Sequence, residues 1–213
     1  MLLAFDTATP FVTVALHDGE HVVAERRSEL RMKHGEQLAP LIEAVLADTG
    51  LVRQDLTALG VGVGPGPFTG LRVGLVTART LAYVLELPVY GVCSLDVVAL
   101  EAALGAAPVG TDFTVATDAR RKEVYLATYD DRGRRLAGPD VVRPADAATE
   151  VPVAGEGAVL YPDAFPDGRH PALPSAGWLA RAVAEELAEL HDPDPMYLRR
   201  PDAIAPGAPK RVS

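Results

Sequence analysis

The start of the chain alternates short apolar runs with polar turns in a pattern that predicts three strands. Residues 2–6 are almost entirely apolar, and residues 12–17 alternate with the two-residue period of a half-buried strand. Asp18-Gly19 is a strong hairpin signal, after which residues 21–29 continue as a third strand. The chain is therefore expected to open with an antiparallel meander.

A spacing of three and four residues between apolar positions then predicts a helix over about residues 34–48, which Gly50 is suited to end. The apolar stripe of this helix is Leu38, Leu41, Ile42, Val45 and Leu46. Residues 59–63 predict a buried strand of small residues. A loop rich in Gly and Pro follows and leads into a second helix that ends near residue 86.

Residues 88–92 predict a fifth strand, and Ser94 is a good N-cap for a third helix that ends near residue 104. The resulting order, three strands followed by three helices alternating with two strands, is similar to the ribonuclease-H-like half of the actin/Hsp70/sugar-kinase (ASKHA) architecture. We therefore predict an α/β fold whose first lobe covers residues 1–106.

A second unit begins with strands over residues 113–118 and 123–129, joined by a basic turn. Only a brief strand at residues 151–154 and a helix over residues 175–190 follow, separated by Pro-rich loops. These signals are too few to repeat the first lobe. We expect a truncated second lobe over residues 107–191 and an irregular tail over residues 192–213.

Composition and charge narrow the functional classes. The chain has 213 residues, 48% hydrophobic and 23% charged, which is typical of a globular protein. The net charge of −9 argues against nucleic-acid binding as the main activity of this chain alone, because such binding needs clustered positive charge. With one cysteine, no apolar span of about 20 residues and no basic leader, we expect a cytoplasmic protein with no membrane partner.

In each of the two units, the first strand ends with a carboxylate. Asp6, Thr7 and Thr9 lie in a turn whose amides and hydroxyls are suited to hold a phosphate, and Asp118 occupies the matching place in the second unit. Across a cleft, two such carboxylates would share a magnesium ion through water. The alternative, which we favour, is that these side chains satisfy turn amides and that Arg120 pairs with Asp118.

The segment from Gly64 to Gly74 is the most distinctive in the chain. It lacks the Gly-Lys-Ser/Thr of a P-loop and does not follow Gly-x-Gly-x-x-Gly. Gly66 and Gly70 are expected to permit close backbone approach and positive φ, while Pro65 and Pro67 stiffen the entry. We therefore predict a structural loop, whose residues are Gly64, Gly66, Phe68, Thr69, Gly70 and Arg72.

The sequence contains few candidate metal ligands or nucleophiles. The five histidines contain no His-x-x-x-His pair, and Cys93 beside an apolar strand is best explained as an inert buried thiol. The second helix carries only Arg72 and Arg79 as charged residues between residues 71 and 85. A helix that is apolar nearly all round must be covered on more than one side, either by its own fold or by a partner.

Several segments together resemble one family. Residues 3–9 resemble its opening Asp-Thr-Ser-Thr turn, and residues 34–42 its His-Ser-Glu-x-Leu-Leu-Pro-x-Ile helix. Residues 64–74 resemble its Gly-Pro-Gly-Ser-Phe-Thr-Gly-Leu-Arg hallmark. Further matches are Asp118-Ala119-Arg120, Glu123-Val124-Tyr125 and Tyr197-Leu198-Arg199. The chain is thereby identified as a member of the TsaB (YeaZ) family, which takes part in threonylcarbamoyladenosine biosynthesis in bacteria.

The resemblance implies a truncated actin/Hsp70-like protein with no catalytic residue and no resident cofactor. It leaves open whether a nucleotide binds weakly or is shared at an interface. It implies a catalytic paralogue, TsaD, as partner, together with the ATPase TsaE, and tRNA contacted only through the complex. TsaD carries a metal-binding His-x-x-x-His where this chain has Ser94 and Val98, which cannot hold a metal ion. Ala8, Gly35 and Pro67 depart from the serines of the family pattern.

In this family the helices of the first lobe form the partner interface. On this chain we expect that interface to contain His34, Leu38, Leu41, Ile42, Val45, Leu75, Arg79, Ala82 and Tyr83. Two alternatives remain open. One is a stand-alone ATP-dependent phosphotransferase or hydrolase that uses Asp6 and Asp118, and the other is a homodimer built on the same helices when the partner is absent.

Overall fold

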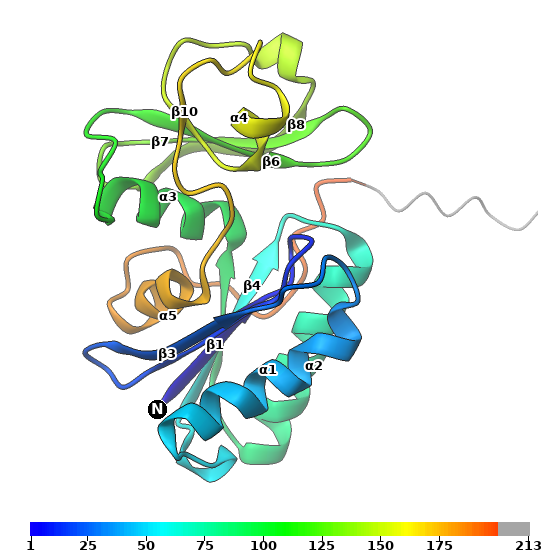
Figure 1. Ribbon diagram of the computed structural model, residues 1–213, viewed down its shortest axis with the longest axis vertical. Helices are drawn as coiled ribbons and strands as arrows, with labels where there is room; N and C mark the ends of the chain where they lie inside the picture. The colour runs from blue at the N-terminus through cyan, green and yellow to red at the C-terminus, as the bar shows by residue number, and fades with distance from the viewer. Residues whose placement is uncertain (200–213) are drawn as a thin grey trace, which may run out of the picture.

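The structure, a computed structural model, describes residues 1–199 and consists of two lobes, each built on a five-stranded sheet (Figure 1). The first sheet has the order β3-β2-β1-β4-β5, in which β1 pairs antiparallel with β2 and parallel with β4. Its strands are β1 (Leu2–Asp6), β2 (Thr13–His17), β3 (Val22–Arg27), β4 (Ala58–Gly64) and β5 (Val89–Cys93). The predicted meander and its Asp18-Gly19 hairpin are confirmed.

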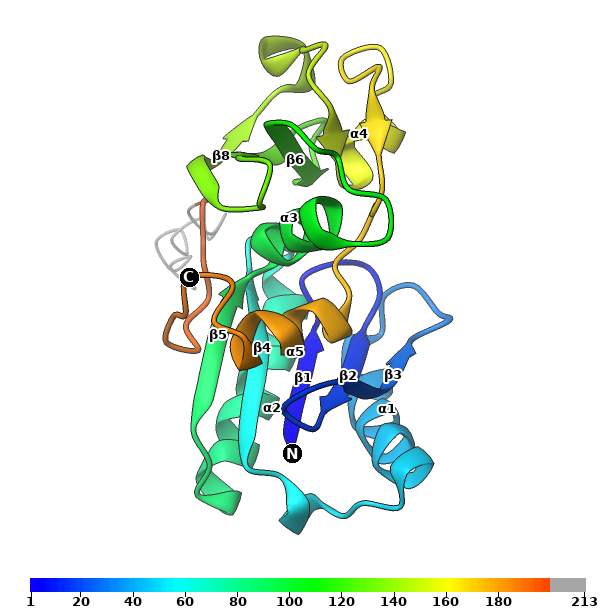
Figure 2. The same ribbon diagram turned by 90° about the vertical axis from the view of Figure 1, so that its left-hand side faces the viewer.

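Helices cover both faces of the first sheet, which is why β1 is buried at every position. Leu3 and Phe5 pack in the core under α1 (His34–Thr49) and α2 (Phe68–Leu85), while Leu2 and Ala4 pack under α5 (Ala176–Ala184) on the opposite face. Figure 2 shows α5 lying across the sheet on the side away from α1 and α2. As expected, α1 ends at Gly50, whose φ of 70° suits glycine.

The second lobe repeats the strand order of the first. Its sheet runs β10-β9-β6-β7-β8, so β6 takes the place of β1, with antiparallel β7 on one side and parallel β9 on the other. The strands are β6 (Phe113–Asp118), β7 (Val124–Tyr129), β8 (Arg135–Val142), β9 (Val153–Ala154) and β10 (Gly168–Arg169). The prediction that this half does not repeat the first was therefore wrong.

The repeat escapes the sequence because its parts are short. The brief strand predicted at residues 151–154 is present as β9, but β9 and β10 have two residues each, too few to show a period. A 3-10 turn at residues 144–147 replaces α1, and the five-residue α4 (Glu156–Leu160) replaces α2. The expectation of a truncated second lobe thus describes its elements correctly, although β8 and α4 were expected to be loop.

The helix that follows each sheet packs against the other lobe. α3 (Ser94–Leu104) follows β5 and contacts β6, β7 and β9, whereas α5 follows β10 and contacts β1 and β2. The two helices also contact each other, so they form the centre of the molecule. The predicted lobe boundaries at residues 106 and 191 stay a prediction. They assign α5 to the second lobe, although α5 packs on the sheet of the first lobe.

Three local expectations need correction. Ser94 is the first residue of α3 rather than its N-cap, which is Cys93, and its hydroxyl bonds elsewhere. α5 ends at Ala184 instead of about residue 190, because Glu186 adopts a left-handed φ of 51° that a helix cannot continue through. The irregular tail is described only as far as residue 199; residues 200–213 lie outside the described part.

Candidate functional site

The turn after β1, where a phosphate was considered, is closed by the chain itself. The carboxylate of Asp6 is 1% exposed; its Oδ1 accepts from the amide of Ala8 at 2.6 Å and its Oδ2 from the hydroxyl of Ser94 at 2.6 Å. The hydroxyl of Thr7 donates to the carbonyl of Gly70 at 2.8 Å, and that of Thr9 to the carbonyl of Phe11 at 3.0 Å. The polar side chains of this turn thus bond to the protein.

Glycines of β4, of α2 and of the loop between them make this closure possible. A Cβ on Gly62 would lie 1.9 Å from Oδ2 of Asp6, and one on Gly74 would lie 2.4 Å from the hydroxyl oxygen of Thr7. On Gly66 and Gly70 it would lie 2.4 Å and 2.5 Å from the carbonyl oxygens of Ala8 and Thr7. The predicted close approach therefore occurs, and it brings the glycine loop against the turn after β1 rather than against a ligand.

The expectation of positive φ was wrong for Gly66 and Gly70, since Gly64 is the loop residue that has it, at 90°. The rest of the predicted structural loop lies at the start of α2. Phe68 and Thr69 are exposed, and the guanidinium of Arg72 lies 3.8 Å from the centre of the Phe68 ring. The loop therefore presents an aromatic ring and a cation at the surface.

Burial also governs the ionisation of Asp6. Removal from water raises the pKa of this carboxyl, and the hydrogen bonds from Ser94 and Ala8 and the nearby His34 oppose that rise. His34 is itself buried, and its Nε2 lies 2.7 Å from the carbonyl oxygen of Thr9. His34 thus tethers α1 to the same turn, which gives it a structural role inside the chain.

Asp118 lies in a different environment, at the edge of a cavity between the lobes. Its Oδ1 accepts from the amide of Arg120 at 2.8 Å and its Oδ2 lies 3.1 Å from the guanidinium of the same residue, so the expected Arg120–Asp118 pair is present. The cavity has a volume of about 380 Å³. It is lined by Gly66, Pro67, Phe68, Asp118, Ala119, Arg120, Arg121, Tyr125, Met196, Tyr197, Leu198 and Arg199. Asp118 therefore faces this cavity, whereas Asp6 does not line it.

This arrangement limits what the two carboxylates can do together. A shared magnesium ion needs carboxylate oxygens free to accept water or metal, but both oxygens of Asp6 are occupied and buried. Within residues 1–199, no three His, Cys, Asp or Glu residues are grouped so that they could hold a metal ion. Ser94 and Val98 are both buried at the start of α3.

Most residues expected at a partner interface lie inside the chain. The side chains of His34, Leu38, Ile42, Val45, Leu75 and Ala82 are at most 9% exposed. The period of a helix shows an apolar face without showing what covers it, and in the structure the chain itself covers these six; their place at a partner interface stays a prediction. Leu41 is half-buried, while Arg79 and Tyr83 are exposed.

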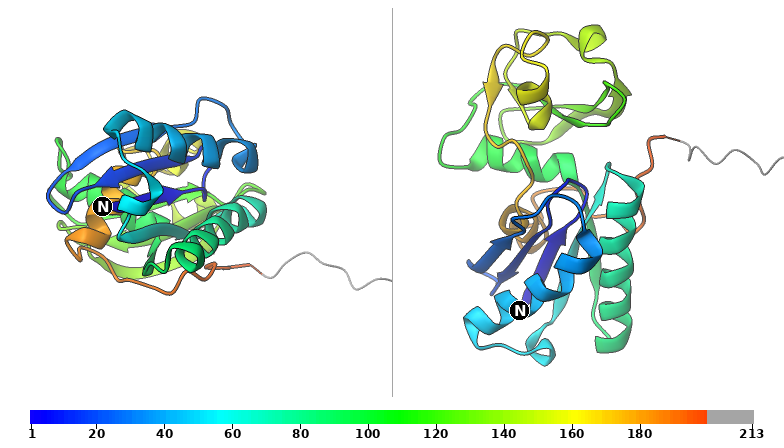
Figure 3. Two further views of the ribbon diagram at one scale, coloured as in Figure 1. Left: turned by 90° about the horizontal axis from the view of Figure 1, so that it is seen from below. Right: turned by 45° about the vertical axis from the view of Figure 1, so that its right-hand side comes forward.

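The outer face of α2 is an uncovered apolar surface of the described chain. Arg72, Val76, Arg79 and Tyr83 are spaced four, three and four residues apart, so they lie along one side of the helix. Val76 and Tyr83 are 61% and 86% exposed, and the adjacent Val84 is 68% exposed. In the right-hand view of Figure 3, α2 lies along the outside of the first lobe. Clustered apolar exposure of this kind is typical of an interaction surface.

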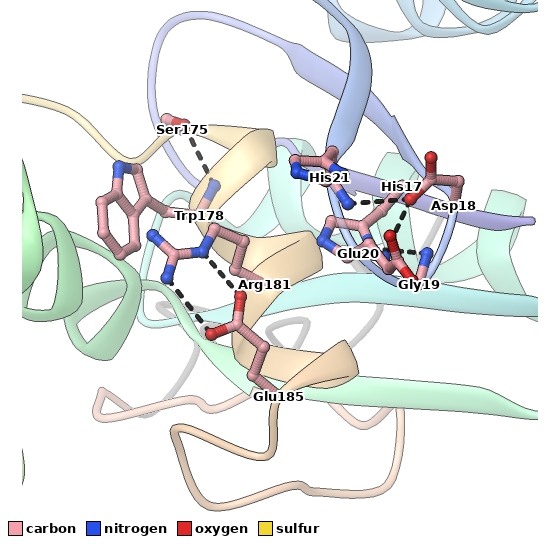
Figure 4. Close-up of polar contacts among 9 residues, drawn as sticks. All are labelled: His17, Asp18, Gly19, Glu20, His21, Ser175, Trp178, Arg181 and Glu185. Atoms are coloured by element: carbon pink, nitrogen blue, oxygen red, sulfur yellow. Dashed lines mark hydrogen bonds and ion pairs between the residues drawn. The ribbon is translucent and has the colours of Figure 1, made fainter.

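The opposite end of the first sheet holds a second polar cluster (Figure 4). His17 is 1% exposed, its Nδ1 accepts from the amide of Gly19 at 3.0 Å, and burial lowers its pKa. On α5, Arg181 pairs with Glu185 at 2.7 Å and stacks over Trp178 at 4.2 Å. These contacts stabilise the β2–β3 hairpin and α5, and they include no activated nucleophile.

The sequence reasoning missed the part of the cavity made by residues 196–199. Arg199 donates to the carbonyl of Ala119 at 2.7 Å and pairs with Glu123, so residues 196–199 reach the second lobe. The sequence did single out this segment, because Tyr197-Leu198-Arg199 was one of the matches to the family. Nothing in the local pattern indicated which part of the fold it contacts.

Two sheets of one strand order, each followed by a helix that packs on the other lobe, define a protein of the actin/Hsp70-like class. YeaZ from Pseudomonas aeruginosa has the same fold, with a TM-score of 0.76 and 29% identity over 92% of this chain and 99% of that one. The family described as TsaD: tRNA N6-adenosine threonylcarbamoyltransferase matches residues 24–164. The predicted fold class is thereby confirmed.

Two relatives extend over nearly the whole chain. The tRNA threonylcarbamoyladenosine biosynthesis protein TsaB of Escherichia coli is 32% identical over 93% of this chain and 94% of its own length. An uncharacterized protein of Mycobacterium tuberculosis is 46% identical over 95% of this chain and 93% of its own. The chain belongs to the TsaB family, as its hallmark loop predicted.

Proposed function

We propose that this chain takes part in forming threonylcarbamoyladenosine in tRNA as a non-catalytic subunit that docks on a TsaD-type paralogue. Membership of the TsaB family supports the pathway, and the match to the TsaD family supports the relationship between the two subunits. The observation that carries the docking part is the exposed face of α2 with Val76, Tyr83 and Val84.

The closed turn after β1 supports a role without catalysis. An ATP-handling site would need Asp6 and Thr7 free to bind metal or phosphate, but their oxygen atoms bond to Ser94, Ala8 and Gly70. A phosphotransferase that used Asp6 and Asp118 would therefore find both oxygens of Asp6 already hydrogen-bonded within the chain. Cys93 is also unsuited to nucleophilic chemistry, because burial raises the pKa of its thiol to about 12.

The chemistry of the outer face indicates the kind of surface that would cover it. Arg72 and Arg79 flank Val76, and no acidic residue occurs in α2. A partner helix with an apolar stripe flanked by carboxylates would complement both properties. A TsaE-type ATPase would join the assembled pair, and tRNA would be held by the complex in the cytoplasm rather than by this acidic chain alone.

Reconstitution with the paralogue tests the docking surface. Val76→Asp should weaken binding to the TsaD-type partner at least about 30-fold and lower tRNA modification accordingly, because a charge at the centre of an apolar interface removes a hot spot. The matched control is Val159→Asp on α4, a valine that is 70% exposed on the second lobe. The control should bind like the wild type.

Omission of the chain tests the proposal as a whole. If the partner and the ATPase modify tRNA at an undiminished rate without this protein, the proposed function is wrong. A homodimer of the isolated chain should form on the same face and dissociate when the partner is added; size-exclusion chromatography of the mixture measures this. Equal effects of Val76→Asp and Val159→Asp would exclude α2 as the docking surface.

A further inference from the structure

The segment that follows α5 crosses from the first lobe to the second beside the cavity between them. We refer to residues 192–199 as the strap. It starts at the edge strand β5, passes the amino-terminal end of α2 and reaches the turn between β6 and β7. Its last four residues form one wall of the cavity.

The strap is anchored firmly where it begins. His191 and Gly91 exchange two backbone hydrogen bonds, of 2.8 Å and 2.9 Å, which extend the sheet beyond β5. A Cβ on Gly91 would lie 2.7 Å from the carbonyl oxygen of Asp192, so this approach requires glycine. The beginning of the strap is therefore part of the first lobe.

Its contacts with the β4–α2 region are a backbone bond, two side-chain contacts and the packing of the Met196 side chain against the core of the first lobe. The amide of Met196 donates to the carbonyl of Val63 at 2.9 Å, and Tyr197 stacks on Phe68 with ring centres 5.3 Å apart. Asp194 pairs with Arg79. Arg79 lies within the exposed face of α2 described above, between Val76 and Tyr83.

The final contacts reach the second lobe. The Arg199 guanidinium donates to the carbonyl of Ala119 and pairs with Glu123, which are both in the β6–β7 hairpin. Leu198 packs against the core formed by α3 and the second sheet. The strap thus bonds to both lobes and spans the cavity between them.

The strength of these contacts is uneven. The side chains of Arg79 and Asp194 are 50% and 72% exposed, so their pair contributes little to stability. Phe68 and Tyr197 are also about 40% exposed. The middle of the strap can therefore be displaced by another surface that offers apolar area and a carboxylate, while the anchor at Gly91 stays in place.

From these contacts we propose that the strap is an intramolecular latch: it fixes the second lobe to the first over the cavity, and a partner that docks on α2 displaces it from Arg79 and Phe68. Docking would then open the cavity and loosen the lobes. The displacement step rests on the proposed function, whereas the latch itself does not.

The latch is tested on the isolated full chain. Nitroxide labels on Ala47→Cys and Leu136→Cys, both exposed, report the distance between the lobes, since the native Cys93 is buried. Arg199→Met should broaden this distance distribution, and Arg143→Met, an exposed arginine outside the strap, should leave it unchanged. Equally narrow distributions in both variants would overturn the latch.

The displacement is tested by hydrogen exchange at the Met196 amide. Tyr197→Ala should raise its exchange rate about fivefold in the isolated chain, because an aromatic pair is lost, whereas Tyr197→Phe keeps the ring and should not. Adding the TsaD-type partner should protect residues 72–84 and accelerate exchange at Met196. Protection of α2 with unchanged or slower exchange at Met196 would overturn the displacement. If the partner does not protect α2, the proposed function is wrong instead. The distance measurement between the nitroxide labels in the isolated chain would then still test the latch.

Discussion

The hydroxyl of Ser94 donates a 2.6 Å hydrogen bond to Oδ2 of Asp6, a residue 88 positions earlier in the chain. The bond joins the end of the first strand to the start of the helix that leads to the second lobe. It occupies a carboxylate that a phosphate-handling protein would keep available. Four glycines let the surrounding backbone come close enough to seal it.

Asp6→Asn distinguishes a structural carboxylate from a catalytic one. Burial raises the pKa of Asp6 above 3.8, so the folded protein holds this proton more tightly than the unfolded chain. Its contribution to stability is full below pH 3.8 and is lost as the pH rises through the folded-state pKa. The variant should therefore gain stability relative to the wild type as the pH rises from 3.8 through the folded-state pKa of Asp6, as measured by urea unfolding.

The same variant should support tRNA modification at the wild-type rate in the reconstituted complex, since Asn can still accept from the Ala8 amide. A large loss of modification by a folded Asp6→Asn protein would contradict a structural role for this carboxylate.

Gly74→Ala should destabilise the protein by about 1–3 kcal/mol, because its methyl group would overlap the hydroxyl oxygen of Thr7 in a closely packed core. Gly35→Ala is the matched control. Gly35 lies in α1 with nothing within 4 Å of the added carbon, so this change should stabilise by about 0.5–1 kcal/mol. Urea midpoints measure both, and a neutral Gly74→Ala would show that the turn after β1 is not tightly closed.

His17 should make the protein sensitive to mild acid. Burial lowers its pKa below 6.5, so the unfolded chain takes up a proton that the folded protein resists. Stability should be lost as the pH falls from 6.5 towards the folded-state pKa. His17→Gln removes the titrating ring, so the difference in unfolding free energy between variant and wild type should change over this range; a constant difference would contradict the burial of His17.

Tyr129→Phe should cost about 1–3 kcal/mol, because it removes the donor to a buried carboxylate. The hydroxyl of Tyr129 donates to Oδ1 of Asp96 at 2.8 Å, and burial already raises the pKa of Asp96. Tyr83→Phe, which alters a hydroxyl on an 86% exposed residue, is the control and should be neutral by thermal unfolding.

Cys93 should not react with thiol reagents in the folded protein. Its thiol is buried and its pKa is raised to about 12, so almost no thiolate is present at pH 8. Modification by a chromogenic disulfide should proceed only as fast as the protein unfolds and should become immediate in denaturant. Rapid reaction under native conditions would contradict the buried position.

The sequence by itself determined the elements of the first lobe and the family. An apolar run located β1, and periods of two and about 3.6 residues located β2 and α1, because all three signals are local properties of the chain. The loop at residues 64–74 identified the family because it resembles that family's Gly-Pro-Gly-Ser-Phe-Thr-Gly-Leu-Arg hallmark. The helical period of α1, however, could not show that Leu38 and Ile42 face the protein's own sheet rather than a partner.

Only the tertiary structure decided which residues close the turn after β1 and which line the cavity between the lobes. The bonds from Ser94 to Asp6 and from Arg199 to Ala119 join residues far apart in sequence, and no local period encodes such distances. The repeated sheet of the second lobe was equally hidden, since a strand of two residues such as β10 carries no pattern of its own and is defined by its pairing with β9.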